Sequence, residues 1–240
     1  MDQYTGTNAQ GPRKWQYQVN YCVDLVFCID ATQSMYPLMD MVKENALRFY
    51  EDFRKSMDRK NKRVAQLRIR VIAFRDYWYD KEDAMLVTRF FRLPEEKEDF
   101  AQCIHSIQVQ GGGDDPEDGL EALTYAIHSD WTKEGFKRRH VIVVWSDAPA
   151  HPLGFGRKAA NYPQSMPKTF AELTALWGNH GAPGKMDQNA KRLLLFTPDG
   201  SGWSEIAREW NQVYLRPSQA GNGLGEQDYA TIMDTICNSI

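Results

Sequence analysis

The sequence predicts an α/β fold in which a central, mainly parallel sheet carries helices on both faces, in a three-layer, doubly wound arrangement. Short apolar segments alternate along the chain with segments of helical periodicity, and this alternation is typical of βαβ units. Several apolar segments have apolar residues at both odd and even positions, as strands covered on both faces do. A chain of 240 residues, 42% of them hydrophobic, suits one such domain, which we assign to residues 19–240.

Six apolar segments are expected to be strands. Residues 22–29, 140–146 and 192–197 are apolar on both faces and belong in the middle of the sheet. Residues 67–74, which read LRIRVIAF, begin by alternating and should lie nearer an edge. The remaining expected strands are residues 84–91 and 212–215, and one edge strand is expected to run antiparallel to the others.

Helical patterns separate these strands. Three of them begin near a proline (Pro94, Pro116 and Pro167), and the first turn of a helix tolerates a residue without a backbone N–H. The expected helices cover residues 35–60, 94–107, 116–128, 167–177, 203–210 and 226–240.

Composition argues against several classes of function. The net charge of −3 and the lack of a basic arm argue against nucleic-acid and membrane-surface partners. No apolar run approaches the roughly 18 residues that a membrane span needs, and residues 1–18 read as a polar, flexible lead-in rather than a signal peptide. The four cysteines show neither zinc-like nor disulfide spacing, which favours a reducing, cytoplasmic compartment: Cys22, Cys28, Cys103 and Cys237.

Oxygen-bearing side chains gather where the expected strands end. DATQS follows the first strand, GGGDDPED opens the helix near Pro116, and WSDAPAH follows the apolar run VIVV. In doubly wound sheets ligands bind outside the carboxyl ends of the strands, so these segments should meet. Together they offer oxygen ligands and no sulfur: Asp30, Thr32, Ser34, Asp114, Asp115, Glu117 and Asp147. This set suits Mg²⁺, with Mn²⁺ or Ca²⁺ as alternatives, and does not suit zinc.

The alternate spacing of Asp30, Thr32 and Ser34 has a physical use. A loop that curls around an ion can aim residues i, i+2 and i+4 inward, and two neutral hydroxyls then coordinate without adding charge. Mg²⁺ keeps several waters when few protein ligands reach it, which leaves a position open to a partner's oxygen. In the simpler reading Asp30 caps a strand end, and Thr32 and Ser34 cap the next helix. A carboxylate directly after a buried strand needs compensation, however, and this favours metal binding.

Three motifs carry a resemblance to a known family. DLVFCIDATQSM, GGGDDPEDGLEAL and VIVVWSDAPAHP together resemble a von Willebrand factor type A domain with its metal-ion-dependent adhesion site. The Asp-x-Pro-Glu and Asp-Ala-Pro forms, with VIAFRDYW after the second strand, are similar to the type A domains of alpha-type kinases and the inserted domains of integrin beta subunits. The likeness covers residues 23–147 well, and beyond them only the strand–helix rhythm matches.

The resemblance implies a set of metal ligands. Asp30, Thr32 and Ser34 come from the first loop and Asp147 from the third. The second-loop ligand stays open, because spacing from Gly119 selects Asp114, whereas the integrin-beta likeness selects Glu117 and leaves Asp114 to a second cation. Asp115 is expected to be a turn or helix-cap residue. The rim that meets a partner is expected to contain Met35, Tyr36, Asp76 and His151.

The resemblance further implies an intracellular protein-binding module. Its partner would contribute an acidic side chain to the Mg²⁺, and the chain would act as an adaptor or scaffold beside a kinase, phosphatase or ATPase. Because a second-loop carboxylate replaces the family's common threonine, we expect the metal to be held harder and acidic partners to be recognised more weakly.

Two other classes of function remain as alternatives. A metal-dependent phosphohydrolase on a related sheet would carry a second aspartate at position 32, where this chain has a threonine, and this difference argues against an enzyme. A structural subunit would use the metal for folding alone. Chelation separates these readings, because loss of partner binding without unfolding favours the binding module.

Overall fold

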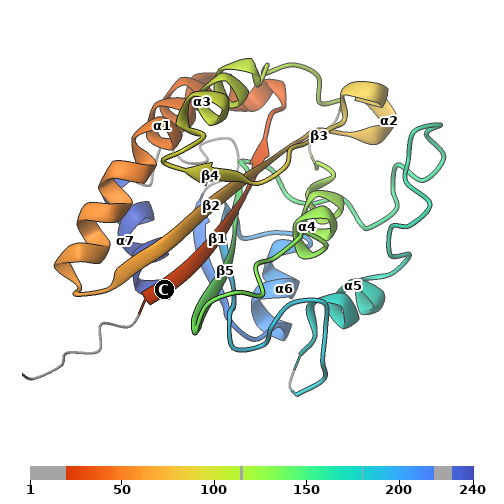
Figure 1. Ribbon diagram of the computed structural model, residues 1–240. Coiled ribbons are helices and arrows are strands. Elements are labelled where there is room, and N and C mark those ends of the chain that lie inside the picture. Colours follow the sequence, from red (N-terminus) through yellow and green to blue (C-terminus); the bar gives the residue numbers. More distant parts are fainter. Residues whose placement is uncertain (1–19, 114–115, 180, 219–228) are drawn as a thin grey trace, which may run out of the picture.

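The computed structural model describes residues 20–113, 116–179, 181–218 and 229–240 (Figure 1). The expected lead-in, residues 1–18, lies outside this part of the chain. The described strands are β1 (Asn20–Asp30), β2 (Arg63–Phe74), β3 (Met85–Val87), β4 (Phe91–Leu93), β5 (Lys137–Trp145), β6 (Lys191–Pro198) and β7 (Val213–Ser218). The described α-helices are α1 (Tyr36–Arg59), α2 (Tyr77–Asp80), α3 (Lys97–Ser106), α4 (Gly119–Ile127), α5 (Phe170–Trp177), α6 (Trp203–Glu209) and α7 (Tyr229–Ser239). Two 3₁₀ turns, η1 (Gln33–Met35) and η2 (Lys81–Asp83), complete the set.

The seven strands form a mainly parallel sheet in the order β3-β2-β1-β5-β6-β7, with β4 also paired to β2. Strands β1, β2, β5, β6 and β7 pair in parallel, whereas β3 and β4 run antiparallel to β2. The predicted α/β class with an antiparallel edge is therefore confirmed. Strand β2 lies next to that edge, as its alternating start indicated.

The antiparallel edge is interrupted where the sequence predicted one strand over residues 84–91. At this point Thr88 N donates to Val71 O at 3.0 Å, and the Thr88 hydroxyl accepts from Val71 N at 3.0 Å. The Thr88 side chain thus takes the place of a backbone carbonyl, so the ladder stops and two strands of three residues remain.

The prolines lie before the helices rather than in their first turns, so that expectation was wrong. Helices α3, α4 and α5 each begin three residues after their proline. At α5 the reason is visible, because Thr169 caps the helix by accepting from Glu172 N at 3.2 Å, while Glu172 accepts from Lys168 N at 2.8 Å. This reciprocal cap starts the helix after Pro167.

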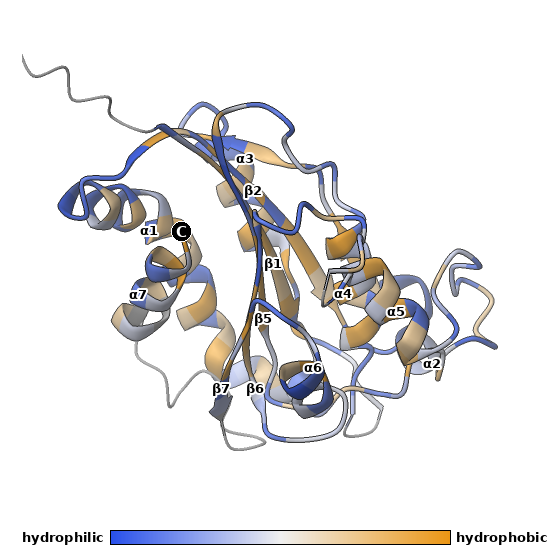
Figure 2. Cartoon of the chain, turned by 90° about the horizontal axis from the view of Figure 1, so that it is seen from below, coloured by the Kyte–Doolittle hydropathy of each residue, from blue (hydrophilic) through white to orange (hydrophobic). Residues whose placement is uncertain are grey.

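Helices cover both faces of the sheet, and the odd and even residues of β1 face different layers. Its residues at positions 23, 25, 27 and 29 pack with α1, α3 and α7, and those at positions 26 and 28 pack with α4, α5 and α6. Figure 2 shows α1 and α7 on one side of the sheet and α4, α5 and α6 on the other. The core is thus two apolar layers that hold β1 between them. No helix in the described ranges combines the length and the apolar character that a bilayer span requires.

The strand order changes direction beside β1. The chain passes from β1 to β2 on one side, while β5, β6 and β7 follow on the other side. Such a switch opens a crevice at the carboxyl ends of the two strands that flank it, which here are β1 and β5. The residues after Asp30 and after Trp145 therefore lie at the position where this class of fold binds ligands.

Candidate metal centre

Strand register brings the first and third sequence motifs to one edge of the sheet, beside the loop that follows β2. Ile29 of β1 pairs with Trp145 of β5, and Asp30 pairs with Phe74 of β2. The loop that begins at Asp30 therefore lies between the loop after Trp145 on one side and the loop after Phe74 on the other.

Four of the predicted ligands form one connected chain of oxygen atoms. Asp30 Oδ1 accepts from Thr32 N at 3.0 Å and from the Thr32 hydroxyl at 2.6 Å. The Thr32 and Ser34 hydroxyls are 3.2 Å apart, and Ser34 Oγ donates to Asp147 Oδ1 at 3.0 Å. Asp30, Thr32 and Asp147 are buried, whereas Ser34 is exposed. The structure thus brings Asp30, Thr32, Ser34 and Asp147 together, with the exposed hydroxyl on the solvent side.

Ser146 completes the network, although it was not among the ligands predicted from the sequence. Its hydroxyl donates to Asp30 Oδ2 at 2.7 Å and is itself buried. The other oxygen of Asp30 is held by Thr32, so both carboxylate oxygens accept hydrogen bonds. The available signal was the position of Ser146 between the end of β5 and Asp147, where a small hydroxyl can face the neighbouring strand.

The glycine-rich second loop is hydrogen-bonded to the first loop through the backbone. Ala31 O accepts from Gln110 N at 3.1 Å, and Gln33 N donates to Gly111 O at 3.2 Å. Gly111 and Gly112 have φ values of +71° and +76°, a region that favours glycine. These two glycines give the second loop the left-handed backbone conformation that it has beside the first loop.

Glu117 lies beside the first loop. A Cβ atom placed on Gly112 would come within 2.9 Å of Glu117 Oε1 and 3.0 Å of Thr32 Cβ, so both side chains border the same space. The Glu117 backbone is tied to the third loop, since Glu117 N donates to Pro149 O at 3.0 Å and His151 N donates to Glu117 O at 2.8 Å. Asp114, Asp115 and the second cation expected near Asp114 fall outside the described residues, so the choice between Asp114 and Glu117 stays a prediction.

The carboxylates here are buried together, and this sets their protonation. Burial raises the pKa of Asp30 to about 6, although the hydrogen bonds from Thr32 and Ser146 act in the opposite direction. Burial first, and then the negative charges of neighbouring acids, raise the pKa of Glu117 to about 10; those acids are Asp30, Asp76, Asp80 and Asp118. A concentration of buried acid of this kind is stabilised by a cation or by protons.

The donor set fits a hard divalent cation. Asp30, Thr32, Ser34, Glu117 and Asp147 offer oxygen alone, which is the preference of Mg²⁺, Mn²⁺ and Ca²⁺. Glu117 Oε2 is buried and has no hydrogen-bond partner within the described part of the chain. An orphaned buried carboxylate oxygen beside two buried aspartates is the feature that a bound cation would satisfy.

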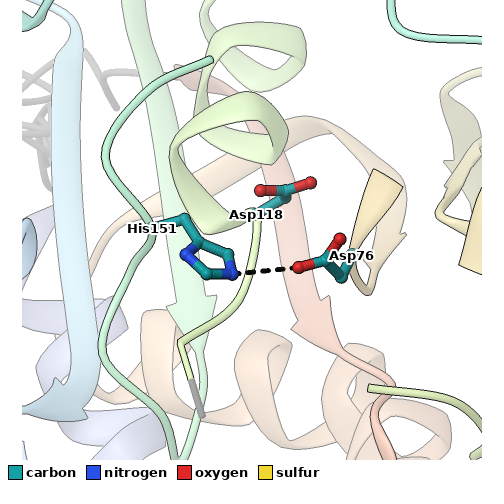
Figure 3. Close-up of side chains that lie close together, drawn as sticks. All are labelled: Asp76, Asp118 and His151. Carbon is teal, nitrogen blue, oxygen red and sulfur yellow. Dashed lines mark hydrogen bonds and ion pairs between the residues drawn. The ribbon is translucent and has the colours of Figure 1, made fainter. Parts of the chain in front are cut away.

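Of the four residues predicted for the rim, Tyr36 is exposed, whereas Met35, Asp76 and His151 are buried. Tyr36 is 74% exposed, next to the first loop. Met35 is fully buried, because the turn η1 directs its side chain into the layer between the sheet and α1. Asp76 and His151 are also buried, and His151 Nε2 lies 2.9 Å from Asp76 Oδ2 (Figure 3). Their polar groups pair with one another instead of facing a partner.

Two acids near this pair were not selected from the sequence. Asp118 precedes α4 and accepts from Tyr77 N at 2.7 Å through Oδ2, and Glu121 accepts from Gly154 N at 2.9 Å and from the Tyr162 hydroxyl at 2.8 Å through Oε1. Both are fully buried. In the sequence Asp118 looks like an ordinary helix cap and Glu121 like a solvated helix residue, so no local signal distinguishes them.

The fold and the sequence place the chain in a family. The family description "von Willebrand factor type A domain" matches residues 25–149, which is just over half of the chain. This chain therefore belongs to the von Willebrand factor type A domain family. Membership of this family supports a general role as a protein-interaction module. The matched residues include the predicted ligands Asp30, Thr32, Ser34, Glu117 and Asp147.

Two relatives show how far the similarity extends. The alpha-protein kinase vwkA of Dictyostelium discoideum is 23% identical over 146 residues, which are 61% of this chain and 21% of the kinase. The solved von Willebrand factor type A protein from Catenulispora acidiphila superimposes with a TM-score of 0.51 and 12% identity, over 91% of this chain and 42% of its own. The chain thus spans about a fifth of the kinase and under half of the solved protein, and the latter supports the fold alone.

Proposed function

We propose that this chain is a protein-binding module that docks a partner through a divalent cation, Mg²⁺ in the first place. The first and third loops would hold the ion through Asp30, Thr32, Ser34 and Asp147, and the second loop would add Glu117 or Asp114. The observation that carries this proposal is the contact between Ser34 Oγ and Asp147 Oδ1 at 3.0 Å, which links two loops 113 residues apart into one oxygen-lined site.

The exposure of the site supports docking rather than a purely internal role. Ser34 is the exposed member of the network, and an open groove of about 630 Å³ adjoins it, lined by Gln33, Ser34, Tyr36, Pro37, Val109, Gln110 and Gly111. Tyr36 is a large apolar side chain that solvent reaches on the edge of this groove. Exposed aromatic side chains are enriched where proteins bind one another. A partner that reaches the ion would therefore also cover Tyr36.

The chemistry of the ion selects the partner group. A bound Mg²⁺ supplies a positive charge with a coordination position open to an outside oxygen. An acidic side chain of the partner fits this position best, since its charge is opposite to that of the ion. The chain's own carboxylates limit this attraction, because each one that binds the ion leaves less positive charge for the partner.

A module that binds a partner and catalyses no reaction itself would act as an intracellular adaptor or scaffold. The similarity to part of an alpha-protein kinase supports an association with a phosphorylation system, in which the present chain would bring a partner close to a kinase, phosphatase or ATPase. Position 32 remains the strongest argument against a phosphohydrolase, because Thr32 uses its hydroxyl to bind Asp30 and cannot serve as a carboxylic acid.

The proposal is tested by affinity capture with the chain as bait, in Mg²⁺ and in EDTA. The unaltered chain should retain partners in Mg²⁺ and release them in EDTA. Asp30→Ala should fail to retain them in either buffer. Asp58→Ala, which removes an exposed acid near the end of α1, is the matched control and should behave as the unaltered chain.

Circular dichroism of the same samples distinguishes the outcomes. Partners that remain bound both in EDTA and to Asp30→Ala would contradict metal-dependent docking. Unfolding of the unaltered chain in EDTA would instead favour the structural role of the metal. Retained secondary structure with lost capture is the expected result.

The second-loop carboxylate gives a sharper test. Glu117→Thr restores the hydroxyl that is common in the family and removes a buried acid, so binding of an acidic peptide should become stronger while the Mg²⁺ affinity falls or holds. Unchanged or weaker peptide binding with an unchanged Mg²⁺ affinity would contradict the proposed limit on acidic partners.

A further inference from the structure

A second group of potential ligands lies behind the candidate metal centre. Asp76 follows β2, Asp118 precedes α4, and His151 follows β5. One ligand atom from each of these side chains lies within 4.8 Å of the other two. In Figure 3 the Asp118 carboxylate stands beside the pair formed by His151 and Asp76. Three elements that are far apart in sequence thus direct nitrogen and oxygen ligands to one point.

Each of these side chains is held in place by a contact outside the cluster. Asp76 Oδ1 accepts from Trp78 N at 2.5 Å and Tyr79 N at 3.2 Å, which leaves Oδ2 to face His151. The His151 ring stacks on Phe155 with centroids 3.8 Å apart and an interplanar angle of 9°. Ligands that are oriented before the ion arrives lose little freedom when they bind it.

One oxygen in the cluster lacks a partner. Asp118 Oδ2 accepts from Tyr77 N, whereas Asp118 Oδ1 is buried and makes no hydrogen bond with any described residue. The Asp118 side chain has no exposed surface. An ionised oxygen in this position is costly unless a cation or a proton satisfies it.

The charges around the cluster are unbalanced. Asp76 and Asp118 belong to the cluster, the buried acids Glu117 and Glu121 lie next to it, and His151 is its one basic ligand. Arg75 is also buried nearby, but its guanidinium donates to the carbonyls of Ala31, Asp83 and Gln108. A divalent cation would offset this excess of negative charge.

We propose that Asp76, Asp118 and His151 form a second cation site, which binds a first-row divalent transition metal such as Zn²⁺. The imidazole separates this site from the all-oxygen centre of Asp30, because nitrogen ligands suit these metals and are poor ligands for Mg²⁺. The distance of 2.9 Å between His151 Nε2 and Asp76 Oδ2 is close to the roughly 3 Å between adjacent ligands of a six-coordinate metal with bonds of about 2.1 Å. It is about 0.5 Å shorter than the roughly 3.4 Å between ligands of a tetrahedral Zn²⁺.

One partly exposed side chain lies between the His151 ring and solvent. Phe155 covers the His151 ring and is itself 44% exposed. The proposal does not depend on partner docking, since the ligands are different side chains and binding can be measured with the metal alone.

Zn²⁺ titration in excess Mg²⁺ tests the proposal, with isothermal calorimetry as the measurement. The unaltered chain should bind one Zn²⁺ that Mg²⁺ does not displace. His151→Gln and Asp118→Asn keep similar volumes and should weaken this binding about 100-fold or more, since even residues that only orient a ligand change affinity about 10- to 100-fold. His105→Gln removes an exposed histidine of α3 and should leave it unchanged.

Asp30→Ala separates the two sites. It should abolish Mg²⁺ binding and retain the one Zn²⁺ if the sites are independent, so failure of either proposal can be recognised alone. Unchanged Zn²⁺ affinity in His151→Gln and Asp118→Asn, or loss of Zn²⁺ binding in Asp30→Ala, would overturn the second site.

A spectroscopic measurement on the unaltered chain guards against variants that do not fold. Proton–nitrogen NMR of the histidine rings should show a shift of the His151 signals when one equivalent of Zn²⁺ is added, with the His105 signals unmoved. His151 signals that do not respond would overturn the proposal, and the Asp76–His151 pair would then be a hydrogen-bonded network without a metal.

Discussion

The hydroxyl of Ser146 donates a hydrogen bond of 2.7 Å to Asp30 Oδ2, between the ends of two adjacent parallel strands. Both residues are buried. The contact orients the acid at the head of the first loop, while Thr32 holds its other oxygen. The candidate metal centre therefore depends on Ser146, which orients a predicted ligand and is not itself a predicted ligand.

Replacement of Ser146 by alanine should destabilise the chain and loosen the centre. A hydrogen bond to a buried carboxylate contributes about 1.5–3 kcal/mol, so the free energy of unfolding should fall by about that amount. Urea unfolding followed by circular dichroism measures it. A change below about 0.5 kcal/mol would mean that the Asp30 oxygen finds another partner.

Gly112→Ala should weaken metal binding more than it weakens the fold. A Cβ atom there would press against Glu117 Oε1 and the Thr32 side chain, and the positive φ adds a strain of about 1–2 kcal/mol. Gly181→Ala is the matched control, because Gly181 has a φ of +91° but no atom of the described residues beyond its chain neighbours lies within 4 Å of an added Cβ. Both variants should lose similar stability in urea, and Gly112→Ala alone should lose Mg²⁺ affinity by calorimetry. Equal Mg²⁺ affinity in the two variants would contradict the placement of Glu117.

Stability without metal should fall as the pH rises. The pKa of Glu117 rises from 4.5 to about 10 on folding and that of Asp118 from 3.8 to about 8. At a pH between the pKa of the unfolded chain and the pKa of the folded chain, these carboxyl groups are protonated only in the folded chain. The free energy of unfolding therefore decreases as the pH rises over this interval. Urea midpoints at about pH 5 and about pH 8, in EDTA, should therefore differ in favour of the lower pH.

Two additions check the origin of this pH dependence. Excess Mg²⁺ should raise the midpoint more at the higher pH, because a bound cation stabilises the ionised carboxylates. Glu117→Gln in EDTA should make the dependence shallower, since its side chain cannot ionise. A midpoint that rises with pH in EDTA would contradict the assignment of these protons to the folded chain.

A buried ion pair away from the centre should matter for stability alone. Arg68 donates to both oxygens of Asp24 at 2.8 and 2.7 Å, and Asp24 is fully buried in β1. Removal of one member of such a pair leaves an uncompensated charge at a cost of about 3–5 kcal/mol, so Arg68→Ala should lower the free energy of unfolding by about this amount.

The matched control for that pair is Lys97→Ala. Lys97 and Glu51 form an exposed pair with side chains 44% and 60% exposed, and such pairs contribute about 0–1 kcal/mol. Urea unfolding of both variants should separate them clearly. An Arg68→Ala variant as stable as Lys97→Ala would show that Thr132 N, which also donates to Asp24 at 2.7 Å, is sufficient to hold the charge.

The layer architecture was predictable because a strand that is buried on both faces has apolar residues at both odd and even positions. The strands β1, β5 and β6 are apolar at both parities, and the structure places them in the middle of the sheet. The helix boundaries were less predictable, since they depend on caps such as Thr169 that a nearby proline concealed. The break between β3 and β4 depends on one hydrogen bond, from Val71 N to the Thr88 hydroxyl, and has no periodic signal.

The sequence alone determined the fold class and the meeting of the first and third motifs, because residues that follow parallel strands must emerge at the same edge of the sheet. It therefore identified Asp30, Thr32, Ser34 and Asp147 as neighbours. Only the tertiary structure decided which other side chains join them. Ser146, Asp118 and His151 acquire their partners from strands and helices that are distant in the chain, and burial turns Met35 and Asp76 inward. The physical reason is that strand order and register determine which distant residues come into contact, and no local sequence pattern indicates strand order or register.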